Sequence, residues 1–410
     1  MPVVVEVPSA WTRQEVSPVR RALPYTLVAP PAIMEPPQAR NATASVSGPA
    51  RSPGRLPSLD GWRALSITLV LGAHCRATWN FPPSLVKAFA WGFDGEMGVR
   101  FFFVISGFLI TWLLLAEQDV SGGVSLSRFY MRRALRILPI YGAFLLVLFL
   151  LQATTAYSQP AGVWVANLTF TTNLLEQPVW TSGHLWSLAV EEQFYLLWPC
   201  LFVALGCGRN LGRAVAILVV PLAVAPLARV IHYLGCEPAA LHRLFTPYSF
   251  LIHFDSLAIG CAAALLLSRR ERETAGWLTR RPLAAAWSGL AMVALPYVLA
   301  RFLVLGIFTV PLGATFESAG AALLMVQSVL LPRAGLYRLL NLAWVAGLGV
   351  LSYSIYIWQE IFCSKPEYFG WSPHWWMAFP FWILPVMATA GASYIFWEKP
   401  FLSLRARFRR

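Results

Sequence analysis

Long apolar runs recur from about residue 58 onward, and they constrain the fold of this chain more than any other feature. Each run is about 18–22 residues long, which is the length that a helix needs to cross the ~30 Å hydrocarbon core of a bilayer. Hydrophobic residues make up 57% of the 410 residues and charged residues only 12%, whereas soluble domains contain about 25% charged residues. We therefore predict an all-α, polytopic bundle of transmembrane helices.

About ten runs qualify as candidate spans. They cover residues 61–78, 99–116, 137–153, 190–206, 213–231, 249–268, 284–301, 312–331, 342–362 and 376–397. With the amino terminus inside, the inner loops carry far more Lys and Arg than the outer loops, as the positive-inside rule requires. This asymmetry predicts a multi-pass membrane protein with both termini in the cytoplasm.

The chain divides into three segments by composition. Residues 1–57 are rich in proline and lack a periodic apolar face, which predicts a disordered cytoplasmic tail. Residues 58–404 hold all the runs and form the membrane domain, and residues 405–410 are a basic cytoplasmic tail. The net charge is +13, but the Lys and Arg residues lie between the apolar runs and form no continuous basic stripe, so we expect no nucleic acid partner. The six cysteines form no CxxC pair, so we expect no metal site.

The first run, LDGWRALSITLVLGAHC, carries two polar side chains, Arg63 and His74. They are eleven residues apart, so on a helix they share one face and are separated by ~16 Å along the axis. Asp60 falls on nearly the same side. Charged groups inside spans are costly and are functional candidates. The spacing alone leaves open a simpler interpretation, in which Arg63 is an anchor at the cytoplasmic rim and His74 is a packing residue.

A second group of polar residues lies in SGHLWSLAVEEQFYLLWP, where His184 precedes a run and Glu191 and Glu192 are expected in the first helical turn. Neighbouring residues on a helix point about 100° apart, so only one of these glutamates can readily face the interior. A buried glutamate can fix the tautomer of a histidine or act as an acid or base. Alternatively, the helix dipole accounts for acidic residues at a helix start.

The stretch RFYMRRALRILPIY contains a third group, Arg132, Arg133 and Arg136. Arg132 and Arg136 are four residues apart and share a helix face, where they can grip a phosphate group. Membrane topology explains the same cluster, and from these residues alone it is the preferred interpretation. In GVRFFFVISGFLIT, Ser106 and Gly107 favour close helix packing. The local sequence supplies no base for Ser106, so we interpret it as a residue lining the substrate site rather than as a nucleophile.

Seven motifs in this order resemble the acyltransferase-3 family of integral-membrane acyltransferases. They are LDGWRALSITLVLGAH, FFFVISGFLIT, RFYMRRALRILPIY, HLWSLAVEEQFYLLWP, FDSLAIG, LSYSIYIW and EKPF, and they span roughly residues 57–404. The family includes O-acetyltransferases of O-antigens and exopolysaccharides, so the resemblance implies a location in the bacterial inner (plasma) membrane. The resemblance implies transfer of an acyl group, often acetyl, from cytosolic acyl-CoA to a hydroxyl of a carbohydrate, a glycolipid or a secreted small molecule, with no bound cofactor.

The resemblance also implies roles for individual residues. His74 is the expected catalytic base, with His184 and Glu192 as further catalytic residues. Arg63, Arg132, Arg133 and Arg136 are expected to bind acyl-CoA, and Asp60, Ser106 and Gln359 to line the substrate site. One position departs from the family pattern, because members commonly have a histidine where this chain has Gln359. Two other classes of function remain open from the residues alone, a transporter or flippase for a lipid-linked sugar and a non-catalytic scaffold.

Overall fold

The computed structural model describes residues 56–236 and 239–408. The predicted disordered tail covers residues 1–57, and its residues 1–55 lie outside the part of the chain that the structure describes. Helices dominate the described residues, which contain no β-strand, so the all-α prediction is confirmed for them. Of the basic tail, Arg405–Phe408 form a short 3₁₀ helix.

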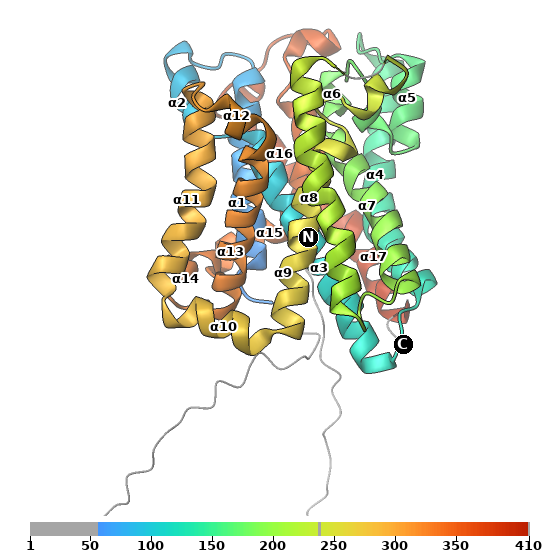
Figure 1. The fold of residues 1–410 in the computed structure, drawn as a ribbon. Helices are drawn as coiled ribbons and strands as arrows, with labels where there is room; N and C mark the ends of the chain where they lie inside the picture. The colour runs from blue at the N-terminus through green and yellow to red at the C-terminus, as the bar shows by residue number, and fades with distance from the viewer. Residues whose placement is uncertain (1–55, 237–238, 409–410) are drawn as a thin grey trace, which may run out of the picture. The chain divides into compact units, whose positions relative to one another are not determined.

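The described residues form seventeen α-helices, joined by short 3₁₀ and π-helical segments (Figure 1). In the first half these are α1 (Leu59–His74), α2 (Val86–Gly92), α3 (Gly95–Ser121), α4 (Leu126–Thr154), α5 (Ala161–Leu168), α6 (Trp180–Gly183), α7 (Leu185–Ala204) and α8 (Leu211–Leu234). The second half contains α9 (Phe250–Arg269), α10 (Glu271–Arg280), α11 (Pro282–Arg301), α12 (Gly306–Phe308), α13 (Ala314–Leu330), α14 (Tyr337–Leu340), α15 (Ala343–Phe362), α16 (Ile383–Ser393) and α17 (Lys399–Leu404).

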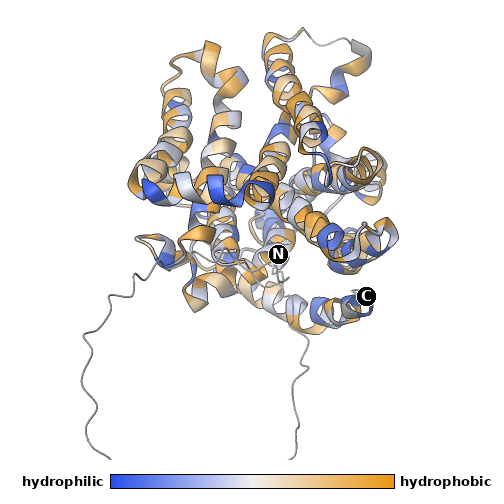
Figure 2. Cartoon of the chain, turned by 60° about the horizontal axis from the view of Figure 1, so that its bottom comes forward, coloured by the Kyte–Doolittle hydropathy of each residue, from blue (hydrophilic) through white to orange (hydrophobic). Residues whose placement is uncertain are grey.

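Six helical segments are long and apolar enough to cross a membrane, and apolar residues dominate the long helices in Figure 2. They are Pro83–Ser121, Leu126–Thr154, Leu211–Leu234, Phe250–Arg269, Pro282–Arg301 and Gly306–Leu330. The other four predicted spans also coincide with helices, namely α1, α7, α15 and α16, but these are shorter or less apolar. Helices α7 and α15 carry the acidic groups of the site described below. The count of ten spans stays a prediction.

Glycines allow the closest helix contacts. A Cβ atom built on Gly107 of α3 would lie 2.0 Å from the carbonyl oxygen of Leu257 on α9, and one on Gly349 of α15 would lie 1.8 Å from the carbonyl oxygen of Asp60 on α1. Only glycine permits such an approach of two backbones. The predicted close packing at Gly107 is therefore confirmed, and α1 is held directly against α15.

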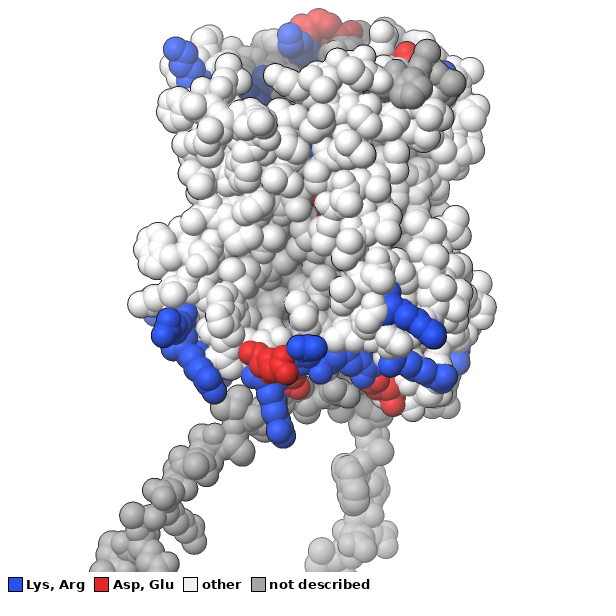
Figure 3. Space-filling view, in the orientation of Figure 1, with Lys and Arg blue, Asp and Glu red and all other residues white. Residues whose placement is uncertain are grey.

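Charged residues gather at one end of the helices on the face shown in Figure 3, where a band of Lys and Arg side chains lies below a nearly uncharged middle. Exposed members of this band in and beside α10 include Arg270, Arg272, Arg280 and Arg281. A basic rim beside an apolar band is the distribution that the positive-inside rule describes. The assignment of this end to the cytoplasm stays a prediction.

Candidate active site

The carboxylate of Glu360 on α15 connects the two histidines that the sequence singles out. Its Oε2 lies 2.6 Å from Nδ1 of His184 and accepts a hydrogen bond of 3.2 Å from the backbone nitrogen of the same residue. Its Oε1 lies 3.6 Å from Nδ1 of His74 at the end of α1. The fold therefore brings together His74, His184 and a glutamate from three different helical regions.

Gln359 fixes the orientation of His74. The side-chain oxygen of Gln359 lies 3.0 Å from Nδ1 of His74. An amide oxygen only accepts hydrogen bonds, and the Glu360 carboxylate on the same side is a further acceptor. In the neutral form of His74, Nδ1 therefore carries the hydrogen and Nε2 the lone pair. This is the tautomer that a general base needs.

Access to His74 distinguishes it from His184. The side chain of His74 is 24% exposed, its Nε2 faces Gly95 at the start of α3, and its ring meets the ring of Trp180 on α6 edge to face at 5.5 Å. His184 is buried, and its Nε2 lies 3.1 Å from the carbonyl oxygen of Ile357. Both nitrogens of His184 therefore face protein acceptors. Of the two predicted catalytic histidines, only His74 can offer a lone pair to a substrate.

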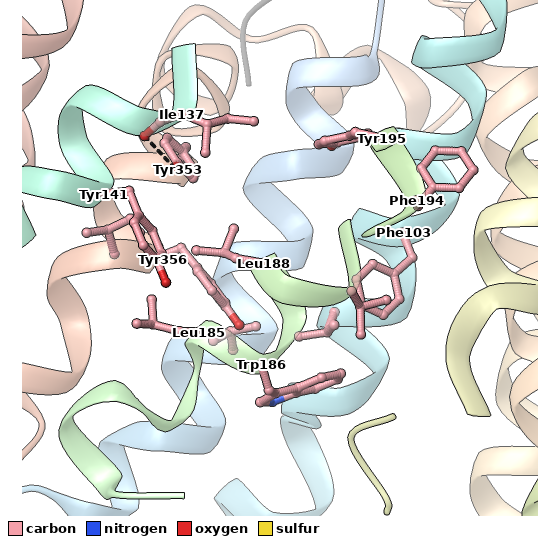
Figure 4. Close-up of a cluster of buried hydrophobic side chains, with 14 of the residues drawn as sticks. Phe103, Ile137, Tyr141, Leu185, Trp186, Leu188, Phe194, Tyr195, Tyr353 and Tyr356 are labelled. Carbon is pink, nitrogen blue, oxygen red and sulfur yellow. Dashed lines mark hydrogen bonds between the residues drawn. The ribbon is translucent and has the colours of Figure 1, made fainter. Parts of the chain in front are cut away.

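A cavity lies between α1, α3, α7 and α15, and one of its lining residues, Tyr356, contacts His184. Its walls are formed by Arg63, Val99, Phe102, Phe103, Ile105, Ser106, Ser187, Leu188, Glu191, Ser352, Tyr353 and Tyr356. Tyr356 connects the cavity wall to His184. Its hydroxyl donates to the carbonyl oxygen of His184 at 3.0 Å and lies 2.6 Å from the hydroxyl of Ser187. Figure 4 shows Tyr356 near Leu185 and Leu188, and Tyr353 beside Ile137, to whose carbonyl oxygen it donates a hydrogen bond. The cavity is thus mostly apolar, with a few polar groups.

Glu191 is the glutamate that faces the cavity. It accepts hydrogen bonds from Ser106 at 2.7 Å and from Tyr195 at 3.0 Å. The prediction that the Glu191–Glu192 pair lies in the first helical turn is wrong, because α7 already begins at Leu185. The helix dipole therefore does not explain these acidic residues. Glu192 is only half-buried, and the carboxylate beside His184 is Glu360 rather than Glu192.

Ser106 has a base beside it that the local sequence did not reveal, namely Glu191. Ser106 nevertheless lies eleven residues after Gly95 on α3, or ~16 Å along the helix from the residue that faces His74. An acyl group on Ser106 would be too far from His74 for that base to activate its acceptor. Ser106 lines the cavity, and its place in a substrate site stays a prediction.

Arginines gather around Arg63, which is the arginine that lines the cavity. Arg63 is buried and bonded to Asp60 at 3.1 Å, so its side chain is not exposed, and its position relative to the cytoplasmic rim stays a prediction. Arg63, Arg133 and Arg405 all lie close enough to Arg136 to repel its charge. Four guanidinium groups from α1, α4 and the Arg405–Phe408 segment therefore form one arginine cluster. Such a concentration of positive charge suits a polyanionic ligand.

The remaining arginine contacts are with aromatic and acidic groups. Arg133 lies over the ring of Tyr195 at 5.0 Å, which links the cluster to the Glu191 network. Arg132 pairs with Glu117 at 2.7 Å and donates to the carbonyl oxygen of Phe408. Arg132 thus holds the carboxyl-terminal segment, a role that the sequence did not indicate.

Sequence reasoning missed Glu360, Trp180 and Arg405. Glu360 had a usable signal, since it is an acidic residue inside the predicted span 342–362, where charge is costly. Trp180 had none, because it lies in a connecting segment and meets His74 only through the tertiary fold. Arg405 looked like one of several basic residues of a tail.

These features define a helical, apolar, membrane-type protein with a partly exposed histidine beside a buried glutamate, and with an internal cavity that is lined by one member of an arginine cluster. The acyltransferase domain of the acyltransferase-3 family matches residues 56–398, so the chain belongs to this family. No solved structure matches the chain.

Two curated relatives are similar over part of their length. "Putative peptidoglycan O-acetyltransferase YrhL" of Bacillus subtilis is 30% identical over 380 residues, which cover 84% of this chain and 54% of the relative. Peptidoglycan O-acetyltransferase OatA of Listeria monocytogenes is 28% identical over 230 residues, which cover 52% of this chain and 34% of the relative. The matched region thus spans about half of the first relative and a third of the second.

Proposed function

We propose that this chain is a membrane O-acyltransferase that moves an acyl group, in the first instance acetyl, from acyl-CoA to a hydroxyl of a carbohydrate acceptor. The observation that carries the proposal is the set of contacts and the exposure of the His74 side chain. Its Nδ1 is fixed by Gln359 and Glu360, and its Nε2 is available in a partly exposed side chain. Membership of an acyltransferase family supports the same chemistry.

The arginine cluster supports acyl-CoA as the donor. Coenzyme A carries several phosphate charges, and Arg63 and Arg136 belong to one cluster, of which Arg63 also lines the cavity. Arg63 and His74 are eleven residues apart on α1, a rise of ~16 Å, which the extended pantetheine arm can bridge. In this arrangement the phosphates stay at the arginine cluster while the thioester reaches His74.

The reaction then needs one base and no acyl-enzyme. Nε2 of His74 takes the proton of the acceptor hydroxyl as its oxygen attacks the thioester carbonyl carbon. The tetrahedral intermediate collapses, the carbon–sulfur bond breaks, and the thiolate leaves. The proton on His74 passes to the thiolate to give free coenzyme A. The carboxylate of Glu360, 3.6 Å from Nδ1, stabilises the imidazolium while it exists.

The names of the two relatives make a peptidoglycan-type glycan the first acceptor to test. The purified full chain in lipid nanodiscs is mixed with acetyl-CoA labelled in the acetyl group and with soluble peptidoglycan fragments. The proposal predicts label in ester linkage on the glycan. Label that remains on coenzyme A with every hydroxyl acceptor offered, together with uptake of a lipid-linked sugar in proteoliposomes, would instead identify a transporter.

A further inference from the structure

Two buried N–H groups beside His74 have no partner. The side-chain nitrogen of Gln359 and the indole nitrogen of Trp180 are both buried and, among residues 56–236 and 239–408, neither finds a hydrogen-bond acceptor. Gln359 itself is fully buried, with an exposed fraction of 0%. A buried donor without an acceptor costs free energy, so two of them on residues that contact the same histidine call for an explanation.

The amide of Gln359 is held in one orientation. Its oxygen lies 3.0 Å from Nδ1 of His74 and accepts from the thiol of Cys363 at 3.6 Å. Because the oxygen and nitrogen of one amide are about 2.3 Å apart, the Gln359 nitrogen lies within about 5 Å of His74 Nδ1. The unpartnered donor is therefore next to the proposed base.

Trp180 approaches the same histidine from α6, with its ring 5.5 Å from the imidazole centre. An indole nitrogen is a donor only, and the nitrogen of a side-chain amide is likewise a donor only. The carboxylate of Glu360, the nearest acidic group, is already engaged by His184 and faces His74. What the two donors lack is an acceptor oxygen, and a ligand bound at His74 can supply it.

We infer that Gln359 and Trp180 form an oxyanion hole that binds the carbonyl oxygen of the acyl group. The inference rests on the proposed function and adds two catalytic residues to it. When the acceptor oxygen bonds to the carbonyl carbon, the carbonyl π electrons move to its oxygen, which becomes negatively charged. The two N–H groups stabilise that charge. When the carbon–sulfur bond breaks, the carbonyl re-forms and the charge leaves with the thiolate.

Two substitutions isolate the donors. Trp180→Phe keeps an aromatic ring beside His74 and removes only the N–H. Gln359→Glu keeps an acceptor oxygen for His74 Nδ1 and removes the N–H₂ group. Because oxyanion donors act in the transition state, kcat for acetyl transfer falls about 100-fold in Gln359→Glu and at least about tenfold in Trp180→Phe. KM for acetyl-CoA stays within about threefold in both. Gln359→His, which restores one N–H, recovers part of the loss.

Asn167→Leu is the matched control, since its buried side-chain nitrogen also lacks a partner but lies on α5. It is expected to leave kcat unchanged. The inference is overturned if His74→Ala is inactive while Gln359→Glu and Trp180→Phe keep kcat within twofold of the parent. If His74→Ala is itself fully active, the proposed function fails instead.

A second measurement is independent of turnover. In the His74→Ala background, infrared difference spectra of bound acetyl-CoA carrying a ¹³C-labelled carbonyl report hydrogen bonding to that oxygen. The carbonyl stretch is expected at lower frequency in the His74→Ala protein than in its double variant with Trp180→Phe. Equal frequencies in correctly folded proteins, judged by their melting temperatures, would contradict the oxyanion hole.

Discussion

Nδ1 of His184 lies 2.6 Å from Oε2 of Glu360, although the two residues are 176 positions apart in the chain. Both are buried, and they connect the start of α7 to α15. The same carboxylate reaches toward His74 with its other oxygen. Glu360 therefore contacts both a buried structural histidine and the proposed base. Its contribution to stability and its contribution to catalysis can be measured separately.

Replacing Glu360 by Gln removes the negative charge but keeps a side chain of the same size. We expect kcat for acetyl transfer to fall about 10- to 100-fold, because the imidazolium of His74 loses its stabilising charge. Glu360→Ala should in addition destabilise the protein by about 3–5 kcal/mol, since it leaves His184 buried without its partner. Steady-state kinetics and thermal unfolding in nanodiscs check these values. Full activity in Glu360→Gln would show that the carboxylate serves packing alone.

The arginine cluster makes a prediction about the donor. Arg136→Gln should raise KM for acetyl-CoA about tenfold, because a buried guanidinium near the phosphates is lost. With S-acetylpantetheine, which lacks phosphate groups, the same variant should match the parent. Arg272→Gln, on the exposed side of α10, is the control. An equal loss with both donors would place Arg136 outside the donor site.

A buried ion pair away from the site should govern stability. Arg229 on α8 donates to both oxygens of Asp255 on α9, at 2.7 and 2.8 Å, and Arg229 also donates to Thr315. Removing one partner of such a pair leaves an uncompensated buried charge. Arg229→Met is therefore expected to lower the free energy of unfolding by about 3–5 kcal/mol. Denaturant unfolding measures this value, and a change below about 1 kcal/mol would contradict the predicted loss.

The close packing of α3 on α9 can be tested by a glycine-to-alanine substitution, which adds one methyl group at the contact. Gly107→Ala places a Cβ atom against the Leu257 carbonyl oxygen, so the helices must separate and the melting temperature should fall by several degrees. Gly142→Ala on α4 is the matched control, because nothing lies within 4 Å of its added Cβ atom. It should be neutral or slightly stabilising, since alanine favours helix more than glycine. Equal melting temperatures of the two variants would show that the contact is not tight.

The sequence predicts the helices well because each apolar run is a local property. All ten predicted runs coincide with helices, although the last helix begins at Ile383 rather than at residue 376. The shared face of Arg63 and His74 is also local, and both side chains do face α15: Arg63 lines the cavity with Tyr353, and His74 contacts Gln359.

Partners between distant helices are not local and could not be predicted. His184 lies close to Glu192 along the chain, but in the fold its partner is Glu360, because α15 passes beside the start of α7. Ser106 appeared to lack a base until α7 brought Glu191 to within 2.7 Å. The burial of Arg63 could not be predicted from the first run alone, because it depends on residues of α3, α7 and α15.

The role of His74 is the central claim, and one rate comparison tests it most directly. The initial rate of label transfer from acetyl-CoA to the glycan is measured for the parent, for His74→Gln and for His374→Gln, an exposed histidine as control. The account predicts a loss of at least about 100-fold in His74→Gln and no change in His374→Gln. Transfer by His74→Gln within twofold of the parent would contradict it.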